Sequence, residues 1–395
     1  MKYRNEYNKE ELSLLGFGCM RFPKKGNGFD TEEVEREIKY AIDNGVNYFD
    51  TAYLYPGSEE MLGRTLYNLN ARDKVNIATK MPHYLMKSVE DAEKKFKEQL
   101  ARLKTDHIDY YLMHMLPDVS TWNELTNRGI DKWLERKKEE GAIRNIGFSY
   151  HGNSGMFIKI LHAYNWDFCQ IQYNYMDENS QAGRAGLEEA ASMRIPVIIM
   201  EPLRGGKLAN SLPKEVHNII NDSGRNWSAA EWAFRWLYDQ SGVSVVLSGM
   251  NSMEMLKENI RIATESECGM LGEEDMLVYK KLTKALNAKM KVPCTGCSYC
   301  MPCPAGVDIP GCFRCLNVSY ADNYFTGLKE YAMCTSLKRE PSMASLCKEC
   351  GMCEQHCPQS IRIREDLKKV RKRFENPAYR VGCKIVNRFM HSSGK

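Results

Sequence analysis

The sequence lacks the features of an exported, membrane-spanning or strongly charged chain. Its 395 residues carry 55 Lys and Arg against 51 Asp and Glu, and the resulting net charge of +4 is too small to favour nucleic acid or a membrane surface as a partner. Its longest apolar runs, such as Pro196–Met200, fall far short of the roughly 18 residues that a membrane helix needs. Residues Met1–Glu11 are polar and charged, so we expect no secretory signal and a cytoplasmic location.

Cysteine is scarce over most of the chain and crowded near one end. Only Cys19, Cys169 and Cys268 precede residue 290, whereas the other twelve of the 15 cysteines lie between Cys294 and Cys383. An odd number so unevenly spread does not fit a disulfide framework, and in a reducing compartment clustered cysteines more often bind metal. The length, with 43% apolar and 27% charged residues, predicts two or three globular domains.

The first 290 residues alternate short apolar runs with amphipathic stretches. The runs that are typical of strands are Leu12–Cys19, Val46–Asp50, Val75–Lys80, Ile108–His114, Ile143–Ser149, Phe168–Tyr173, Val197–Met200 and Val243–Ser248. Between them, stretches such as Val89–Leu103 and Trp122–Glu139 space their apolar residues three and four apart, as amphipathic helices do. Thr31 is the expected N-cap of a further helix, which Asn44-Gly45 ends.

This alternation predicts the fold of the first 290 residues. Strands that alternate with helices form parallel sheets that are buried on both faces. Eight strands in about 250 residues indicate an α/β fold of the (β/α)8 TIM barrel type rather than an open sheet. An open dinucleotide-binding sheet would usually show G-x-G-x-x-G after its first strand, and no such motif follows Cys19 or Asp50.

Four ionisable residues fall where a barrel of this kind places its catalytic groups, at the carboxyl ends of strands and in the loops after them. Asp50, Lys80 and His114 end the second, third and fourth runs, and Tyr55 lies in the loop after Asp50. A tyrosine with its usual pKa near 10 is a poor acid at neutral pH, but an adjacent ammonium lowers that pKa. Lys80 would thus activate Tyr55 as a proton donor to a carbonyl oxygen, Asp50 would hold Lys80, and His114 would donate to the developing oxyanion or help relay the proton. Each residue alone has a structural alternative, and the four together favour catalysis.

The spacing Asp-x4-Tyr, followed by a strand-terminal Lys and a strand-terminal His, resembles the catalytic tetrad of the aldo-keto reductases. The flanking segments Leu15–Arg21, Gly57–Gly63 and Gly147–Ser149 agree with it, and the resemblance extends over roughly residues 10–265. It implies a barrel that binds NADP or NAD as a cofactor. Ser248–Met255, where NADP-selective members carry basic residues, holds no Lys or Arg, so NAD is at least as strongly expected as NADP.

The same resemblance implies residues for the nicotinamide coenzyme. They are Ser149 and Gln172 for the carboxamide, Pro202, Leu203, Arg204, Gly205, Gly206 and Lys207 for the pyrophosphate, and Glu258 and Asn259 for the adenosine end. The glycines of this set allow close backbone approach, and its two cations can meet phosphate charge.

Two cysteine-rich motifs follow the barrel. Cys347, Cys350, Cys353 and Cys357-Pro358 have the bacterial ferredoxin spacing, in which three thiolates bind one four-iron cluster and the fourth binds a second cluster. The first motif, Cys294, Cys297, Cys300 and Cys303-Pro304, is one residue short in its last gap. We expect two 4Fe-4S clusters, one held by Cys294, Cys297, Cys300 and Cys357, and the other by Cys347, Cys350, Cys353 and Cys303. A competing register uses Cys297, Cys300 and Cys303 and leaves Cys294 spare, and tetrahedral zinc is the alternative metal.

These motifs predict three parts of the chain: the barrel over residues 1–290, a small ferredoxin-like, mostly helical iron–sulfur domain over 291–363, and a basic C-terminal tail over 364–395. A helix over Glu273–Met290 is expected to end the barrel. Residues 361–395 hold eleven Lys or Arg and three Asp or Glu, which is typical of a solvated or docking segment. A ferredoxin-type electron-carrier protein is the partner that such a segment would fit. The whole arrangement resembles a bacterial and archaeal subgroup of the aldo-keto reductases.

The sequence therefore predicts an enzyme that reduces a small-molecule aldehyde or ketone to an alcohol with NAD(P)H, with iron–sulfur clusters in a structural, redox-sensing or electron-transfer role. The alternative is an electron-transfer protein whose clusters exchange electrons with an external ferredoxin while the barrel serves as a nucleotide-binding platform. A non-catalytic regulatory subunit is a third hypothesis, which the intact set Asp50, Tyr55, Lys80 and His114 disfavours.

Overall fold

The computed structural model describes residues 1–4, 11–116, 118–151, 154–178, 181–210, 212–294, 299–321, 323–337 and 341–391. The chain forms two compact units, Met1–Asn210 with Asn226–Met276, and Ser211–Arg225 with Leu277–Lys395. The second unit thus begins before residue 290, where the barrel was expected to end, and it also includes residues 211–225.

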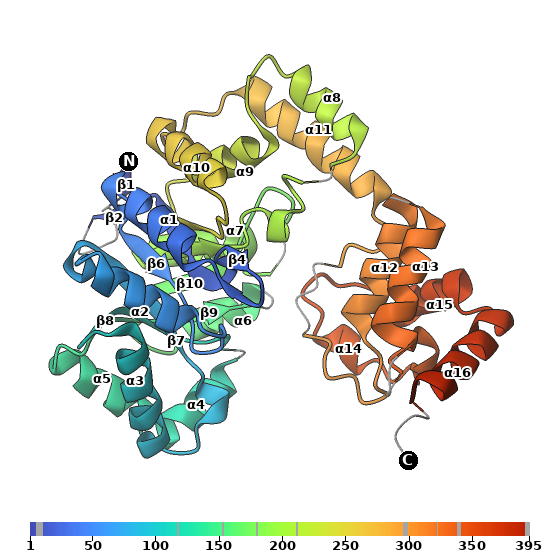
Figure 1. Ribbon diagram of the computed structural model, residues 1–395, viewed down its shortest axis with the longest axis horizontal. Coiled ribbons are helices and arrows are strands. Elements are labelled where there is room, and N and C mark those ends of the chain that lie inside the picture. The colour runs from blue at the N-terminus through green and yellow to red at the C-terminus, as the bar shows by residue number, and fades with distance from the viewer. Residues whose placement is uncertain are drawn as a thin grey trace. The chain divides into compact units, whose positions relative to one another are not determined.

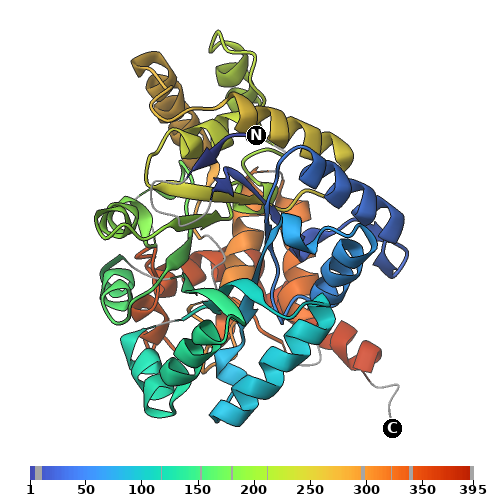
Figure 2. The same cartoon turned by 90° about the vertical axis from the view of Figure 1, so that its left-hand side faces the viewer.

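Eight parallel strands close into a barrel in the first unit (Figure 1). They are β3 Leu15–Gly18, β6 Tyr48–Asp50, β7 Asn76–Met81, β8 Ile108–Met113, β9 Ile143–Tyr150, β10 Phe168–Gln172, β11 Val197–Met200 and β12 Val243–Ser248. Each strand pairs with the next one along the chain, and β12 pairs with β3 to close the barrel. Figure 2 shows these strands enclosed by helices. The predicted eight-stranded (β/α)8 barrel is confirmed.

Aromatic and branched apolar side chains fill the barrel. The cluster consists of Leu12, Tyr48, Ala78, Tyr110, Leu112, Phe168, Ile198, Val245 and Leu247. The Tyr110 ring lies edge-on to the rings of Tyr48 and Phe168, with centroid distances of 5.1 and 5.0 Å. The interior is therefore a packed core that fixes the strands, and the strand ends form a rigid platform for functional side chains.

Helices and short antiparallel pairs surround the barrel strands. The helices are α1 Thr31–Asp43, α2 Ser58–Asn68, α3 Val89–Leu103, α4 Val119–Asn127, α5 Ile130–Glu139, α6 Ser154–Leu161, α7 Gly183–Ser192, α9 Ala229–Tyr238 and α10 Met253–Glu265, with 3-10 turns at Cys19–Arg21, Arg72–Lys74, His83–Leu85 and Arg204–Gly206. The antiparallel pairs are β1 Tyr3–Arg4 with β2 Leu12–Ser13, and β4 Lys24–Lys25 with β5 Gly28–Phe29.

Two helix predictions need correction. The cap of α1 is Asp30, whose carboxylate accepts a hydrogen bond from the backbone N–H of Glu33, so Thr31 is instead the first helical residue. The stretch 122–139 is not one helix but parts of α4 and α5. The chain breaks at Gly129, whose φ of 81° lies in the left-handed region that a helix interior does not allow and glycine adopts freely.

Helices and loops make up the described residues of the second unit. Its elements are α8 Lys214–Asn221, α11 Glu273–Lys289, which begins in the first unit, α12 Ile309–Ala321, α13 Tyr324–Tyr331, a π-helix at Ala332–Ser336, a 3-10 turn at Ala344–Leu346, α14 Met352–Gln355, α15 Ile363–Phe374 and α16 Pro377–His391. Across the described ranges of both units, no helix combines the length and the apolar character that a bilayer crossing requires.

The segment 364–395, expected as a basic tail, is mostly helical, and its first part belongs to a core. Leu367, Val370 and Phe374 on α15 are buried, and the Phe374 ring stacks on Tyr331 of α13 at a centroid distance of 4.8 Å. Their spacing of three and four residues puts them on one face, while the cations of α15 occupy the other. The excess of Lys and Arg therefore reflects only the exposed face of α15. It gave no indication that the opposite face of the helix is buried.

Candidate active site

Lys80 and Asp50 form a buried ion pair at the ends of adjacent strands. The Lys80 ammonium donates to Asp50 Oδ1 at 2.6 Å and to the carbonyl oxygen of Thr51 at 2.7 Å. The Gln170 amide, from β10 across the barrel, donates to Asp50 Oδ2 at 2.9 Å. Both carboxylate oxygens and the ammonium therefore have partners, which a buried charge pair requires.

Tyr55 and His114 complete a contiguous cluster with this pair. Tyr55 lies in the turn between β6 and α2, and the Lys80 ammonium is 5.1 Å from the centre of its ring. The imidazole of His114, directly after β8, lies edge-on to the Tyr55 ring with a centroid distance of 6.2 Å. The structure thus brings the four residues singled out in the sequence to one place.

Burial dominates the acidity of the phenol. Burial raises the pKa of Tyr55, and the nearby Lys80 ammonium lowers it by less, so the pKa of Tyr55 stays above its usual value. This is contrary to our expectation that Lys80 brings it down toward neutrality. Burial alone would lower the pKa of Lys80, but Asp50 and Tyr55 outweigh it, so the pKa of Lys80 is raised and the side chain is an ammonium.

The histidines at this end of the barrel are neutral at physiological pH. Burial, with the Lys80 ammonium nearby, lowers the pKa of His114 to about 3. Burial also lowers the pKa values of His83 and His151. Tyr84, whose ring lies against both His83 and His114, is 50% exposed. The Tyr55 ring therefore lies against the neutral imidazole of His114, which in turn contacts the exposed ring of Tyr84.

Ser149 and Gln172 end up buried at the ends of β9 and β10, with different partners. The Ser149 hydroxyl accepts a hydrogen bond from the backbone N–H of Met115 at 2.8 Å. The Gln172 amide nitrogen donates to Asp177 Oδ2 at 2.7 Å, whereas the amide oxygen of Gln172 is buried and has no hydrogen-bond partner among the described residues. That oxygen is a free acceptor at the barrel end.

The loop after β11, over Pro202, Leu203, Arg204, Gly205, Gly206 and Lys207, makes a sharp turn. Arg204, Gly205 and Gly206 have φ values of 48°, 71° and 94°, a run of left-handed residues that glycine makes favourable. Lys207 is exposed. The Arg204 side chain instead turns inward, where its Nε lies 3.0 Å from Asp177 Oδ2. The structure thus pairs Arg204 with a carboxylate rather than leaving it open toward a phosphate.

Glu258 and Asn259 lie on α10 after β12. The Asn259 amide is buried and donates to the Ser248 hydroxyl at 3.1 Å, which ties the helix to the strand end. Glu258 is partly exposed. The two residues thus share a helix, but only Asn259 is joined to the end of the barrel strand.

A sequence model of the aldo/keto reductase family matches residues 14–269, more than half of the chain. The chain belongs to the aldo/keto reductase family. It is 26% identical to an uncharacterized oxidoreductase, YqkF, of Bacillus subtilis over 69% of this chain and 94% of that one. It is 25% identical to L-galactose dehydrogenase of Arabidopsis thaliana over 65% of this chain and 86% of that one. Among solved structures, the holo form of the aldo-keto reductase AKR11C1 from Bacillus halodurans superposes with a TM-score of 0.58 and 25% identity, covering 72% of this chain and 97% of that one.

Three residues of this aldo/keto reductase were missed by sequence reasoning. Asp177 binds both Gln172 and Arg204, and Tyr84 exposes its ring beside His114. Arg21, in the turn after β3, donates to the carbonyl oxygen of Gly205 at 3.3 Å. All three follow the ends of barrel strands, and this position was the one feature from which they could have been predicted. Their partners are distant in the sequence, and no local motif identifies them.

Six of the predicted metal ligands of this aldo/keto reductase pack against one apolar core of the second unit, namely Cys294, Cys300, Cys303, Cys347, Cys353 and Cys357. Cys294, Cys300 and Cys357 line one cavity, together with apolar residues that include Ile309 and Phe313. Cys297 lies outside the described residues. Among the described His, Cys, Asp and Glu residues, no group of three or more is arranged to hold a metal ion.

Burial and the nearby Glu354, Cys347 and Cys303 raise the pKa of Cys353 to about 11. Cys350, the second cysteine of the later motif, is exposed.

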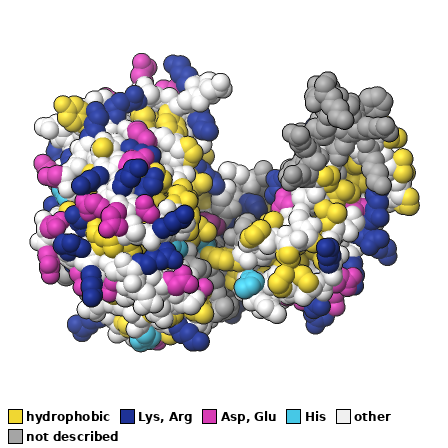
Figure 3. All heavy atoms as spheres, turned by 90° about the horizontal axis from the view of Figure 1, so that it is seen from below, with side chains coloured by type: hydrophobic (Ala, Val, Ile, Leu, Met, Phe, Trp, Pro, Cys, Tyr) yellow, Lys and Arg dark blue, Asp and Glu magenta, His cyan; other side chains and the backbone are white. Residues whose placement is uncertain are grey.

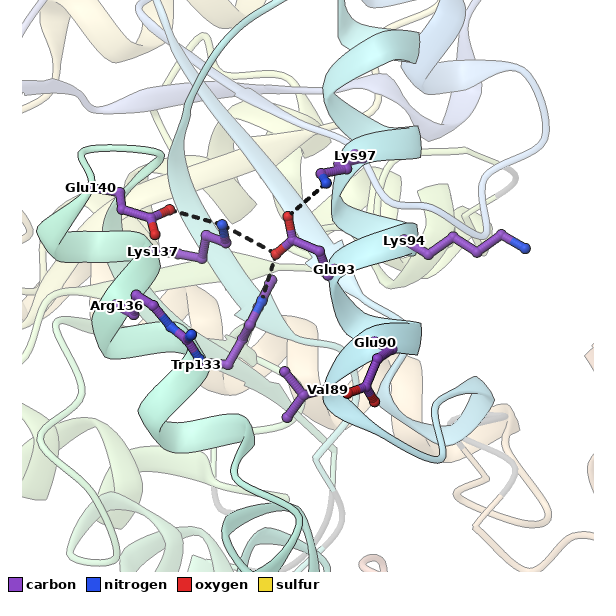
Figure 4. Close-up of a pocket in the computed structure, with 9 residues that line it drawn as sticks. All are labelled: Val89, Glu90, Glu93, Lys94, Lys97, Trp133, Arg136, Lys137 and Glu140. Carbon is purple, nitrogen blue, oxygen red and sulfur yellow. Dashed lines mark hydrogen bonds and ion pairs between the residues drawn. The ribbon is translucent and has the colours of Figure 1, made fainter.

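A groove lies between α3 and α5 of the barrel unit, away from these residues (Figure 4). Glu93 at its centre accepts from the Trp133 indole at 2.9 Å and pairs with Lys97 and Lys137. None of the residues predicted for the site lies in it. On the face drawn in Figure 3, acidic and basic side chains of the barrel unit are interspersed. This face therefore has no extended patch of positive or negative charge.

Proposed function

We propose that this chain is a carbonyl reductase that uses NAD(P)H to convert a small aldehyde or ketone to an alcohol. The observation that carries the proposal is the Asp50–Lys80 ion pair with the Lys80 ammonium over the Tyr55 ring and His114 against that ring. Such a set places one neutral hydroxyl, that of Tyr55, beside a permanent cation, which suits protonation of an oxygen that gains negative charge.

When bound, the reduced nicotinamide supplies the hydride. Tyr55 donates its hydroxyl proton to the carbonyl oxygen, and the Lys80 ammonium stabilises the tyrosinate that remains. Asp50 keeps Lys80 charged and in place, and Gln170 fixes Asp50. His114 is neutral, so its imidazole N–H can donate a hydrogen bond to the substrate oxygen, while the proton that is transferred comes from Tyr55.

The residues present fit a nicotinamide dinucleotide. The buried, unpaired amide oxygen of Gln172 can accept from a carboxamide N–H, and Ser149 is buried at the neighbouring strand end. The left-handed turn at Gly205 and Gly206 presents backbone at the surface, where a pyrophosphate can approach. Asn259 and Glu258 would hold the adenosine end, with Lys207 and Arg21 as the nearby cations.

We also propose that the second unit is ferredoxin-like and holds two 4Fe-4S clusters, as in the subgroup that the sequence resembles. Cys294, Cys297, Cys300 and Cys357 would bind one cluster, because three of them line one cavity. Cys347, Cys350, Cys353 and Cys303 would bind the other, because Cys303 does not line the first group's cavity. This placement favours the expected register over the one that leaves Cys294 spare.

When bound, each cluster exchanges single electrons. An electron-carrier protein of the ferredoxin type is the partner that such chemistry would serve, and a reducing, cytoplasmic compartment would keep the ligating thiols available. Cys350 is the exposed member of its motif and so marks the side of the second unit from which a partner could approach.

The test is steady-state reduction of a panel of small aldehydes and ketones by the parent and by Tyr55→Phe and Cys350→Ala. We expect Tyr55→Phe to lose at least about 100-fold in kcat and Cys350→Ala to retain activity. Tyr84→Phe and Cys268→Ala are the matched controls, a tyrosine beside His114 and an exposed cysteine of the barrel unit. Full activity of Tyr55→Phe would refute carbonyl reduction by this set. Loss of activity in Cys350→Ala alone would favour the electron-transfer alternative.

A further inference from the structure

Cations line a groove formed by the last two helices of the chain, α15 and α16 (Figure 1). Its walls carry Lys368, Arg371 and Lys372 from α15 and Arg380 from α16, and its volume is about 680 Å³. One carboxylate, that of Glu375, lies among these cations. This surface, the α15–α16 groove, is therefore a concave site of positive charge on a chain whose net charge is small.

Two of the four cations in the groove have no carboxylate partner. Arg371 and Lys372 are exposed and form no ion pair with any described residue. Arg380, by contrast, has its Nη2 3.5 Å from Glu375 Oε2. The negative end of the helix dipole favours cations in the last turn of α15, which accounts for their position in the sequence. Their charge remains available to a partner that brings carboxylates of its own.

Exposed apolar side chains border these cations on α16. Val381, which lines the groove, is 57% exposed, and Ile385 is 52% exposed. Their spacing of four residues puts both on one face of α16. Single apolar residues are common at protein surfaces, whereas apolar area beside a charged groove is typical of an interaction site. There the apolar area supplies affinity, and the charge supplies orientation and a fast encounter.

The basic face of α15 connects the groove to the second cysteine motif. The Lys368 ammonium, at the edge of the groove, lies 2.8 Å from a carboxylate oxygen of Glu349, the residue directly before the exposed Cys350. One turn earlier on the same face of α15, Arg364 lies 2.8 Å from a carboxylate oxygen of Glu354 on α14. This face of the helix therefore runs from the loop around Cys350 into the groove.

The opposite face of α15 belongs to the core that the cysteines surround. Leu367, Val370 and Phe374 are buried in that core, and Cys347 and Cys353 pack against it. An α-helix with its side chains is about 10–12 Å across, so the groove lies about one helix diameter from this core. Electron exchange between proteins requires redox centres that lie close together, and the groove meets this condition for a cluster held by the second motif.

We propose that the α15–α16 groove is the docking surface for an acidic electron-carrier protein of the ferredoxin type. The inference rests on the proposed iron–sulfur role of the second unit, and it adds the surface that the partner contacts. Carboxylates of the carrier pair with Arg371 and Lys372, and an apolar side chain beside them packs on Val381. Redox partners form small interfaces that charge guides into place, and a groove of this size can supply one.

Other anionic partners fit the groove less well. An anionic bilayer or a nucleic acid binds through a larger set of cations, which contact several headgroups or phosphates at once. In the groove, Arg371 and Lys372 are the two cations without a carboxylate among the described residues, and Glu349 at its edge would repel a polyanion. A flat bilayer would also touch the rims of a concave site without reaching its floor.

The test measures binding of an acidic two-cluster bacterial ferredoxin to the full chain by titration calorimetry. The Kd of the parent should rise at least about tenfold between about 20 and about 300 mM NaCl, because salt screens exposed charges. Combining Arg371→Glu with Lys372→Glu should weaken binding at the lower salt concentration at least about tenfold. Combining Lys280→Glu with Lys281→Glu, which reverses two adjacent exposed cations on α11, should leave the Kd within about twofold.

Three outcomes would overturn the proposal. Equal losses in the two double variants would show that binding follows net charge and not the groove. A parent that does not bind the ferredoxin at low salt would remove the partner. Vesicles containing phosphatidylserine, or a DNA duplex, might be bound more tightly than the ferredoxin by the parent and lost in the variant of Arg371 and Lys372, which would assign the groove to another class of partner.

The parent alone gives an independent test should the charge reversals disturb the fold. A ferredoxin whose carboxylates have been converted to neutral amides should bind the parent at least about tenfold more weakly, and equal binding would overturn the proposal. Iron analysis of the same sample reports on the clusters separately. Binding through the groove by a chain that holds no iron would remove the proposed clusters and support the docking surface. Full iron content without binding would remove the docking surface and leave the clusters in place.

Discussion

The Lys80 ammonium lies 5.1 Å from the centre of the Tyr55 ring, yet the pKa of Tyr55 is above its usual value. Burial outweighs the ammonium because the free-energy cost of removing a phenolate from water is larger than the stabilisation that one neighbouring positive charge provides. The phenol is therefore fully protonated at neutral pH. Its proton moves only when a stronger base, such as a carbonyl oxygen that has gained negative charge, lies beside it.

Lys80→Met should damage both activity and stability. The substitution leaves Asp50 buried with Gln170 as its remaining side-chain donor, which should lower the free energy of unfolding by about 3–5 kcal/mol, and it should lower kcat at least about 100-fold. Urea unfolding and steady-state reduction measure the two effects. Because the folded pKa of Lys80 is raised above its unfolded value, the contribution of the pair to stability is complete below about pH 10 and is lost as the pH rises through the folded pKa.

The chain offers a matched control at its surface. Lys95 lies over the ring of Tyr53 and forms an ion pair with Glu98. This group therefore repeats the lysine, tyrosine and carboxylate of the buried cluster in a half-exposed setting. Lys95→Met should cost less than about 1 kcal/mol and leave kcat unchanged, since exposed ion pairs contribute little. Equal destabilisation by the two substitutions would show that burial of the Lys80 pair is not what makes it matter.

His114 should remain neutral far below the range in which histidine usually titrates. Burial and the charge of Lys80 lower the pKa of His114 to about 3. In NMR spectra of selectively labelled histidines, the signals that vanish in His114→Gln should show no protonation between pH 5 and pH 8. A midpoint near 6.5, the usual value for histidine, would contradict the structure and would make His114 a candidate proton donor in its own right.

Glu37 on α1 should make the protein less stable as the pH rises. Its carboxylate is buried without a hydrogen-bond partner among the described residues, and burial, with Glu33 adding to it, raises the pKa of Glu37 to about 7. A carboxyl whose folded pKa is raised binds more protons folded than unfolded, so stability falls between about pH 4.5 and pH 7. Unfolding free energies at pH 5 and pH 8 should differ by about 2–3 kcal/mol more in the parent than in Glu37→Gln.

The neighbours of Glu37 set the control for that measurement. Arg36 on the same helix partly offsets the effect and Glu254 on α10 adds to it, so both remain unchanged in the comparison. Glu32→Gln, at an exposed position in the first turn of α1, should show the pH dependence of the parent. If the free energy of unfolding of the parent did not change between pH 5 and pH 8, the carboxylate of Glu37 would have to be exposed to solvent.

The strands and the cluster around Tyr55 could be predicted because their signals are local. Each barrel strand is a short apolar run, and the fold rule that functional groups lie at strand ends then selects Asp50, Lys80 and His114. The break at Gly129 was also visible, but the apolar spacing on either side of it was continuous enough to suggest one helix. The choice of Asp30 over Thr31 as a cap depends on which side chain turns back to the first N–H groups, and both types can do so.

The sequence did not allow us to predict which side chains that are distant in the chain would contact one another. Arg204 is 27 residues from Asp177, and nothing in either segment indicates that the guanidinium meets a carboxylate rather than a phosphate. Likewise, the strong charge of residues 364–395 concealed the apolar spacing of Leu367, Val370 and Phe374, which form a core face. Composition averages over both faces of a helix, whereas burial depends on one of them.

The register of the first cysteine motif can be decided by a single substitution. If Cys294 is a cluster ligand, as its place in the cavity with Cys300 and Cys357 favours, Cys294→Ser should reduce the iron of anaerobically purified protein from about eight to about four atoms per chain and halve the absorbance near 400 nm. Cys268→Ser, an exposed cysteine of the barrel unit, should retain both. Full iron content in Cys294→Ser would support the competing register instead. Zinc in place of iron, with no visible absorbance in the parent, would remove the clusters from the proposal while leaving the chemistry of Tyr55 untouched, because the two rest on different residues.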